Sequence, residues 1–186
     1  MKILNREIGP GDRPYLIAEM SGNHNQSLER ALEIVDAAAA HGADAIKLQT
    51  YTADTMTLNV RMPGFVIDDP KSLWVGRQLY ELYEEAHTPW AWHQPIMERA
   101  AKHGVHCFST PFDFSAVDFL ESLNVPAYKI ASFENTDLPL IRRVAATGKP
   151  IIMSTGMATA GEIDEAVRAA REAGCQDLVL LKCTST

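Results

Sequence analysis

Apolar and polar residues divide this chain into short apolar runs and longer stretches with helical periodicity. In the first such stretch the apolar positions run from Leu28 to Ala39 at intervals of three to four residues, and Gly42 supplies a stop. The same alternation recurs to the end of the sequence. It predicts strands over 15–19, 43–49, 105–109, 127–131, 150–154 and 178–183, with helices over 28–41, 88–103, 115–123, 137–147 and 160–173.

Helix-start signals support this division. Thr88-Pro89 suits an N-cap followed by proline at the first helical position, and Thr159 with Glu162 fits a capping box. Six strands separated by helices imply right-handed βαβ units and hence an α/β fold with a parallel sheet, either an open sheet or a barrel. Residues 2–8 are expected to form a hairpin that closes the bottom of such a barrel.

One connection is longer than the others. Residues 50–88 lie between the second and third predicted strands and contain Pro63-Gly64, Asp69-Pro70 and an amphipathic segment near Leu79. A long insertion after the carboxyl end of a strand is where α/β proteins place substrate loops. Alternatively, this segment is a variable surface loop with no role in substrate binding.

Composition narrows the class of protein. The 186 residues suggest one domain, and 17 basic against 24 acidic residues give a net charge of −7. This balance argues against a nucleic-acid or anionic-membrane binder, while leaving room for a local basic pocket. No apolar run reaches membrane-spanning length, no secretory signal is present, and the three cysteines form no CxxC pair. The expectation is a cytoplasmic protein with reduced thiols.

Polar residues gather where the predicted strands end. Because carboxyl ends of parallel strands meet at one edge of a sheet, these side chains are expected to converge on a site. The converging residues are Glu19, Lys47, Gln49, Ser109, Thr110, Lys129, Ser132, Glu134, Ser154, Thr155, Lys182, Thr184 and Ser185.

The lysines are the most informative of these residues. Lys47, Lys129 and Lys182 each lie in or directly after an apolar strand, where an unpaired ammonium is costly to bury. Three such lysines at equivalent strand ends favour a pocket for an anionic, oxygen-rich substrate. Internal ion pairs with Glu19, Asp44 or Glu134 are one alternative, and a Schiff-base nucleophile is another.

Other motifs in the sequence say less about function than the lysines do. The histidines form no HxH or HExxH pair, so structural roles are expected for them. The segment from Ser154 to Met157 suits either a phosphate cradle or an ordinary loop. The chain lacks both the GxxxxGK[ST] loop and the GxGxxG fingerprint, so nucleotide binding is not indicated.

Five ordered segments resemble the sialic acid synthase family across nearly the whole chain. Details such as Ser21-Gly22 and Gln26 are more similar to the branch that makes pseudaminic acid than to the one that makes N-acetylneuraminic acid, with the legionaminic acid branch left open. The five segments are residues 17–25, 43–50, 108–113, 129–132 and 154–157.

The resemblance implies a TIM-barrel-type (β/α)8 enzyme that condenses phosphoenolpyruvate with an open-chain N-acetylated amino sugar and releases phosphate. The amino sugar of the implied branch is 2,4-diacetamido-2,4,6-trideoxy-altrose. By matching positions, Gln49 and Glu134 would face the sugar and Glu19 would orient or deprotonate the attacking water. The residues that would hold phosphoenolpyruvate are Lys47, Thr110, Lys129, Ser132, Ser154 and Ser185, the last standing where much of the family has asparagine.

The resemblance also implies features beyond this sequence. The family uses a divalent metal ion (manganese, magnesium or cobalt) held by two histidines on later strands, and it forms homodimers in which a C-terminal antifreeze-like domain caps the partner's site. Because the sequence stops at Thr186, about six barrel strands are expected here. A complete metal site is not expected in this chain. An inactive barrel fragment is therefore a further alternative to an enzyme domain.

Overall fold

The computed structural model describes residues 1–184, and within them six parallel strands form one sheet. The strands follow one another across the sheet in chain order, as consecutive βαβ units require, so the predicted parallel α/β fold is confirmed. Each strand lies within or beside its predicted range. They are β3 (Ile17–Glu19), β4 (Ala45–Thr50), β5 (His106–Pro111), β6 (Tyr128–Ile130), β7 (Ile151–Ser154) and β8 (Leu178–Leu181).

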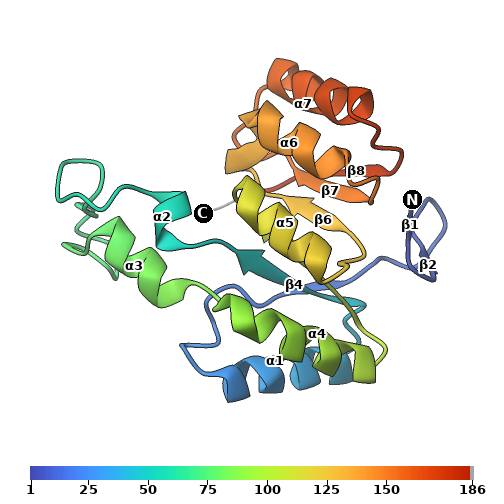
Figure 1. Cartoon of the computed structure of the whole chain (residues 1–186), viewed down its shortest axis with the longest axis horizontal. Coiled ribbons are helices and arrows are strands. Elements are labelled where there is room, and N and C mark those ends of the chain that lie inside the picture. The colour runs from blue at the N-terminus through green and yellow to red at the C-terminus, as the bar shows by residue number, and fades with distance from the viewer. Residues whose placement is uncertain (185–186) are drawn as a thin grey trace.

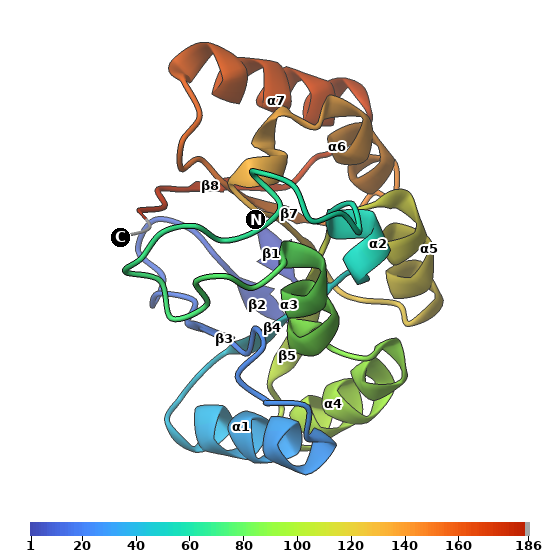
Figure 2. The ribbon, with the colours of Figure 1, turned by 90° about the vertical axis from the view of Figure 1, so that its left-hand side faces the viewer.

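The sheet curls into about half of a barrel, with the helices outside it in an arc (Figures 1 and 2). Helices α1 and α4 cover β4 and β5, while α5, α6 and α7 cover β6 and β7. The helices that cover the sheet are α1 (Leu28–Ala40), α4 (Trp90–Lys102), α5 (Phe114–Ser122), α6 (Leu138–Ala145) and α7 (Ala160–Glu172).

Local capping explains where most helices begin. The side chains of Ser27, Asp113 and Asp137 accept hydrogen bonds from backbone N–H groups of the first turns of α1, α5 and α6. Thr159 and Glu162 form the predicted capping box of α7. The prediction for α4 is wrong by one residue: Pro89 precedes the helix, and the Thr88 hydroxyl lies 3.1 Å from His24 Nε2 instead of capping it.

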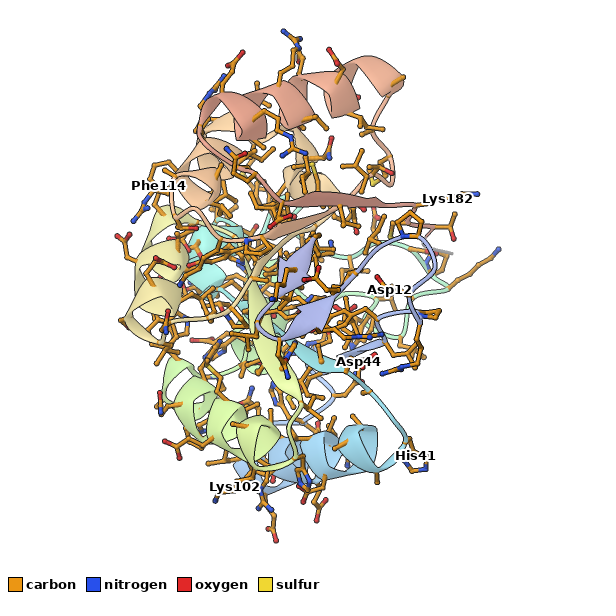
Figure 3. The ribbon with its side chains drawn as sticks, turned by 90° about the vertical axis from the view of Figure 1, so that its right-hand side faces the viewer. Asp12, His41, Asp44, Lys102, Phe114 and Lys182 are labelled. Atoms are coloured by element: carbon orange, nitrogen blue, oxygen red, sulfur yellow. The ribbon has the colours of Figure 1, made fainter. Side chains whose placement is uncertain are left out.

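The inner face of the sheet has an apolar floor. Ala45, Phe108, Ala127 and Ile152 are buried together beneath the strand centres. Ile3 joins them from the hairpin of β1 (Lys2–Ile3) and β2 (Arg6–Glu7), which lies at the amino-terminal end of the sheet (Figure 3). This confirms the predicted hairpin and its position, and it leaves the carboxyl end of the inner face for polar residues.

The long connection after β4 covers the carboxyl edge. It contains α2 (Ala53–Met56), a loop, and α3 (Leu79–Ala86), all on the side that faces the viewer in Figure 2. Its position over this edge supports the interpretation of the insertion as a substrate loop. Among residues 1–184 no helix combines the length and apolar character needed to cross a bilayer.

Candidate active site at the carboxyl edge of the sheet

A pocket of about 460 Å³ opens at the carboxyl edge of the curled sheet. It is bounded by β3 at one side of the sheet and by the end of β8 at the other, so the curl itself brings these two edge strands to one cavity. Its lining includes seven of the nine predicted site residues: Glu19, Lys47, Gln49, Thr110, Lys129, Ser132 and Ser154.

The two-residue period of a strand explains why these side chains face inward. In β4, Ile46 and Leu48 pack outward against the helices, so Lys47 and Gln49 point to the opposite face. The same alternation in β5 places Thr110 two residues above Phe108 of the floor. Apolar residues therefore fill the bottom of the half-barrel and polar residues line its top.

Lys47 is 8% exposed, and its ammonium lies 2.7 Å from Glu19 Oε1. Register pairs these two residues directly across β3 and β4. One of the internal ion pairs considered from the sequence therefore forms, but it forms inside the pocket. Asp44 instead pairs with Arg13 at the opposite end of the strand. The Lys47–Glu19 pair places an acceptor and a donor side by side on the pocket wall.

Lys129 is 6% exposed and lies on β6, near Lys47. Its Nζ donates to the Ser154 hydroxyl at 2.7 Å and to the Ile130 carbonyl at 2.6 Å. Burial, reinforced by the positive charge of Lys47, lowers the pKa of Lys129 to about 8. The carboxylates of Glu19 and Glu134 act on Lys129 only from a distance, since no carboxylate of the described residues lies in ion-pair contact with it. A bound anion would counter the pKa lowering by placing a negative charge directly at the ammonium.

Two hydroxyls in this pocket lack partners. Thr110 Oγ1 and Ser132 Oγ are buried and make no hydrogen bond to any described residue. Unsatisfied buried donors are rare and costly in folded proteins, so their presence beside two ammonium groups is a sign of a site built for ligand oxygens. The backbone at Gly156 comes so close that a Cβ there would lie 2.9 Å from Ser132 Oγ.

The remaining predicted residues have different positions. Glu134 lies on the 3-10 helix η1 (Phe133–Thr136) and is half-buried, but it is not among the described residues that line the pocket. Burial raises the pKa of its carboxyl group. Lys182 is exposed at the pocket rim, and its side chain extends away from the protein (Figure 3), so the prediction of three equivalent buried lysines is wrong for this one. Ser185 lies outside the described residues.

The backbone N–H of Thr155, after β7, donates to the Leu181 carbonyl at 3.0 Å. It is therefore already engaged and does not serve as part of a phosphate cradle. The contribution of this segment to the pocket is the Ser154 hydroxyl.

Two residues of the site were not predicted from the sequence. Phe112 forms part of the pocket wall, and the side-chain amide of Asn135 donates to the Ser154 carbonyl. Phe112 follows Thr110 at a two-residue interval beyond β5, a spacing that signals the same inner face.

The histidines have structural contacts, as expected from the sequence. His93 is buried between α4 and the sheet, with Nε2 at 2.8 Å from Thr50 Oγ1, and burial lowers its pKa to about 4. His106 contacts the Tyr15 hydroxyl through Nδ1. Across residues 1–184 no three His, Cys, Asp or Glu side chains lie close enough together to hold a metal ion, so the described residues do not fit a complete divalent-metal site.

The pKa of Lys129 predicts how anion binding depends on pH. A phosphate monoester is already almost fully ionised above about pH 7, since its second pKa is about 6. Above pH 8 the free protein loses the Lys129 proton, so the affinity of the pocket for a phosphate monoester is expected to fall between pH 7.5 and about 9.5. Calorimetric titrations across this range test the expectation. In Lys129→Met the decline should disappear; a decline of the same size in that variant would assign it to another group.

Fold and pocket together define the class of protein. It is an α/β-barrel protein with a cationic, hydroxyl-lined site at the carboxyl ends of its strands, the edge where barrel enzymes place their active sites. The chain belongs to the NeuB family, whose sequence model matches residues 34–186, and this confirms the resemblance to sialic acid synthases.

Particular members of the family show how similar this chain is to known synthases. The chain is 49% identical over 172 residues to a pseudaminic acid synthase of Campylobacter jejuni and 48% identical over 172 residues to that of Helicobacter pylori, covering 92% of this chain and 50% of each relative. It thus spans about half the length of these curated relatives. The crystal structure of an N-acetylneuraminic acid synthetase from Leptospira borgpetersenii, 28% identical, superimposes with a TM-score of 0.84 over 100% of this chain and 59% of that one.

Proposed function

We propose that this chain forms the phosphoenolpyruvate-binding part of a sialic-acid-type synthase whose product is pseudaminic acid. The second substrate in this proposal is open-chain 2,4-diacetamido-2,4,6-trideoxy-altrose. The observation that carries the proposal is the pocket that combines two buried ammonium groups with two unpartnered hydroxyls. The 48–49% sequence identity to the pseudaminic acid synthases of Campylobacter jejuni and Helicobacter pylori supports the choice of pseudaminic acid as the product.

Phosphoenolpyruvate carries a phosphate and a carboxylate, and the pocket offers matching groups. Lys47 and Lys129 supply positive charge, and Thr110, Ser132 and Ser154 supply hydroxyl donors. Charge-assisted hydrogen bonds of this kind are roughly twice as strong as neutral ones. Ser185 is proposed as a further contact from the resemblance alone.

The proposed reaction joins C3 of phosphoenolpyruvate to the aldehyde carbon of the sugar, and the aldehyde oxygen takes a proton to become a hydroxyl. Water adds to C2 of phosphoenolpyruvate, and the proton it loses balances the one taken up by the aldehyde oxygen. The hydroxyl thus formed at C2 becomes the keto oxygen as the bond between C2 and the phosphate oxygen breaks, and its proton leaves with the phosphate. The products are a nine-carbon 2-keto acid and inorganic phosphate. Glu19, half-exposed beside Lys47, is the proposed group that orients or deprotonates the water. Gln49, which lines the pocket, is proposed to face the sugar. For Glu134, which is not among the described residues that line the pocket, the same role is proposed from the resemblance alone.

The proposal extends to the whole protein in three respects. The whole protein is proposed to bind a divalent metal ion. The remaining barrel strands, which would carry the metal ligands, are proposed to lie outside residues 1–186. A C-terminal antifreeze-like domain that completes a homodimer is proposed to lie outside these residues as well. The coverage of about half of each curated relative supports this division. A cytoplasmic location is proposed as well, in keeping with the free thiols of Cys107, Cys175 and Cys183.

An assay of the full-length protein that carries this sequence tests the proposed reaction. With phosphoenolpyruvate, the diacetamido sugar and a divalent metal ion, one phosphate is expected per nine-carbon keto acid, followed by colorimetry and mass spectrometry. Turnover of N-acetylmannosamine or of the legionaminic acid precursor in place of this sugar would reassign the product. Phosphate release without a new carbon–carbon bond would contradict the synthase proposal.

A Schiff-base aldolase is the second candidate, because the pKa of Lys129 is lowered as in amine nucleophiles. Two of the hydrogens of the Lys129 ammonium are engaged by Ser154 and Ile130, which favours an anion-binding role. Borohydride treatment of the protein in the presence of each substrate is therefore expected to leave the intact mass unchanged. A mass increase that is lost in Lys129→Met would instead establish the aldolase.

A further inference from the structure

A second pocket of about 420 Å³ lies beside the phosphoenolpyruvate pocket. The two share one residue, Gln49, whose Oε1 accepts a hydrogen bond from Ser21 Oγ at 3.3 Å. The walls of the second pocket come from the loop after β3 and from the insertion after β4, segments that Figure 2 shows side by side over the carboxyl edge. Its lining residues include Ser21, Asn25, Tyr51, Trp74, Leu82 and Tyr83.

The two pockets differ in charge. Three lysines line the first, whereas no lysine or arginine of residues 1–184 lines the second. Glu85, whose carboxylate lines the second pocket, lies 2.7 Å from Arg77, so its charge is balanced. Aromatic faces together with amide and hydroxyl groups suit an uncharged solute that carries both methyl and amide groups.

An aromatic wall connects the pockets. Phe112 of the first pocket packs edge-on against Tyr51 at a centroid distance of 5.5 Å, and Tyr51 packs in the same way against Tyr83 at 5.8 Å. Trp74 also lines the second pocket and is 49% exposed, so it has apolar surface that a ligand could cover. One continuous molecule can therefore reach from the lysines to Trp74 along this wall.

The loop that forms the other wall is held in place. Gln26 Nε2 donates to the carbonyls of Glu85 and His87, and buried His24 contacts Thr88. Ser21, Asn25 and Gln26 all have positive φ, a conformation that is costly for residues other than glycine. Strain of this kind persists where surrounding contacts over-determine the backbone, so this wall is pre-organised.

We infer that the second pocket is the specificity subsite for the far end of the amino sugar, an inference that rests on the proposed function. With its aldehyde carbon beside phosphoenolpyruvate, an extended six-carbon sugar passes Gln49 and brings its C4 acetamido group and C6 methyl group into the second pocket. The acetamido group meets the amide and hydroxyl side chains of the β3–α1 loop, and the methyl groups pack on Trp74 and Tyr83. The pocket thereby selects an acetamido group over a hydroxyl at C4.

Trp74→Ala in the full-length protein tests this inference, because a half-exposed loop side chain can be removed without opening the core. The value of kcat/KM is expected to fall roughly tenfold or more with the diacetamido sugar, as for loss of an apolar pocket contact. Turnover of N-acetylmannosamine, which has hydroxyls at C4 and C6, should change by less than about threefold, and the KM for phosphoenolpyruvate should stay constant. Phe114→Ala, on α5 outside both pockets, serves as an exposed aromatic control (Figure 3).

An equal loss with both sugars, or no loss with either, would overturn the inference. Calorimetric titration of the diacetamido sugar into wild type and Trp74→Ala, without turnover, gives an independent reading. If the wild-type protein condenses neither sugar but binds the diacetamido sugar only while Trp74 is present, the proposed reaction fails and the subsite stands. If binding is the same in both proteins, the subsite is refuted even where the reaction is found.

Discussion

Lys129→Ala is expected to weaken phosphoenolpyruvate binding by roughly 10- to 150-fold, the equivalent of one lost charge-assisted hydrogen bond of about 1.5–3 kcal/mol. Lys129 lies 6% exposed in the pocket, where few water molecules can replace it as a partner for the ligand. Its removal also leaves the Ser154 hydroxyl without the donor it now has at 2.7 Å. Isothermal titration of phosphoenolpyruvate into the full-length protein at pH 7 measures the effect.

Two further variants separate loss of charge from loss of packing. Lys129→Met keeps an unbranched side chain over the apolar floor but removes the ammonium, so its affinity should match that of Lys129→Ala. Lys102→Ala removes an exposed lysine on α4, far from the pocket, and should bind like the wild type (Figure 3). Unchanged affinity in both Lys129 variants would remove the basis of the proposed function.

Phe108→Ala is expected to lower the free energy of unfolding by about 3–5 kcal/mol, the usual cost of truncating a buried aromatic residue. Phe108 is 1% exposed and lies in the middle of the apolar floor, against Ile3 of the hairpin and Ile152 of β7. These neighbours belong to separate elements that cannot easily move together to fill the cavity. Urea unfolding of the full-length protein, followed by circular dichroism, measures the change.

The matched control for stability is Phe114→Ala, since Phe114 is 50% exposed on α5. Its effect should stay within about 0.5 kcal/mol, as for most surface substitutions. If Phe108→Ala were equally mild, the floor would not be the packed centre that holds the strands beneath the pocket. If it alone abolished phosphoenolpyruvate binding while the protein stayed folded, the floor would be necessary to position Lys47 and Lys129.

Much of the site could be predicted because strand alternation is a local property. Lys47 and Gln49 are two residues apart in an apolar run, and this spacing alone puts them on one face. Thr110 and Ser154 end their strands in the same way. The position of the hairpin was predictable from its short apolar pattern, and the α7 capping box from Thr159 and Glu162. The start of α4 was not, because Thr88 found a tertiary partner in His24.

Lys47, Lys129 and Lys182 illustrate what the sequence could not distinguish. All three follow apolar residues near strand ends, but only the first two are buried in the described structure, since β8 lies at the edge of the sheet and leaves Lys182 to solvent. The second pocket could not be predicted from the sequence either. Its walls join residues near 21–25 to residues near 74–86, and no spacing along the chain reports such a contact.

The sequence by itself determined the order of strands and helices, most of the side chains on the inner face and the family to which the chain belongs. Ser109, also expected at the site, instead contacts Thr50 on the helix-facing side of the sheet. Periodicity and capping act over a few residues, so they can be read directly from the chain. Only the tertiary structure decided which cations are buried, that Glu19 pairs with Lys47, and that a neutral pocket adjoins the cationic one. These features depend on the curl of the sheet and on loop packing, which arise from contacts between residues far apart in sequence.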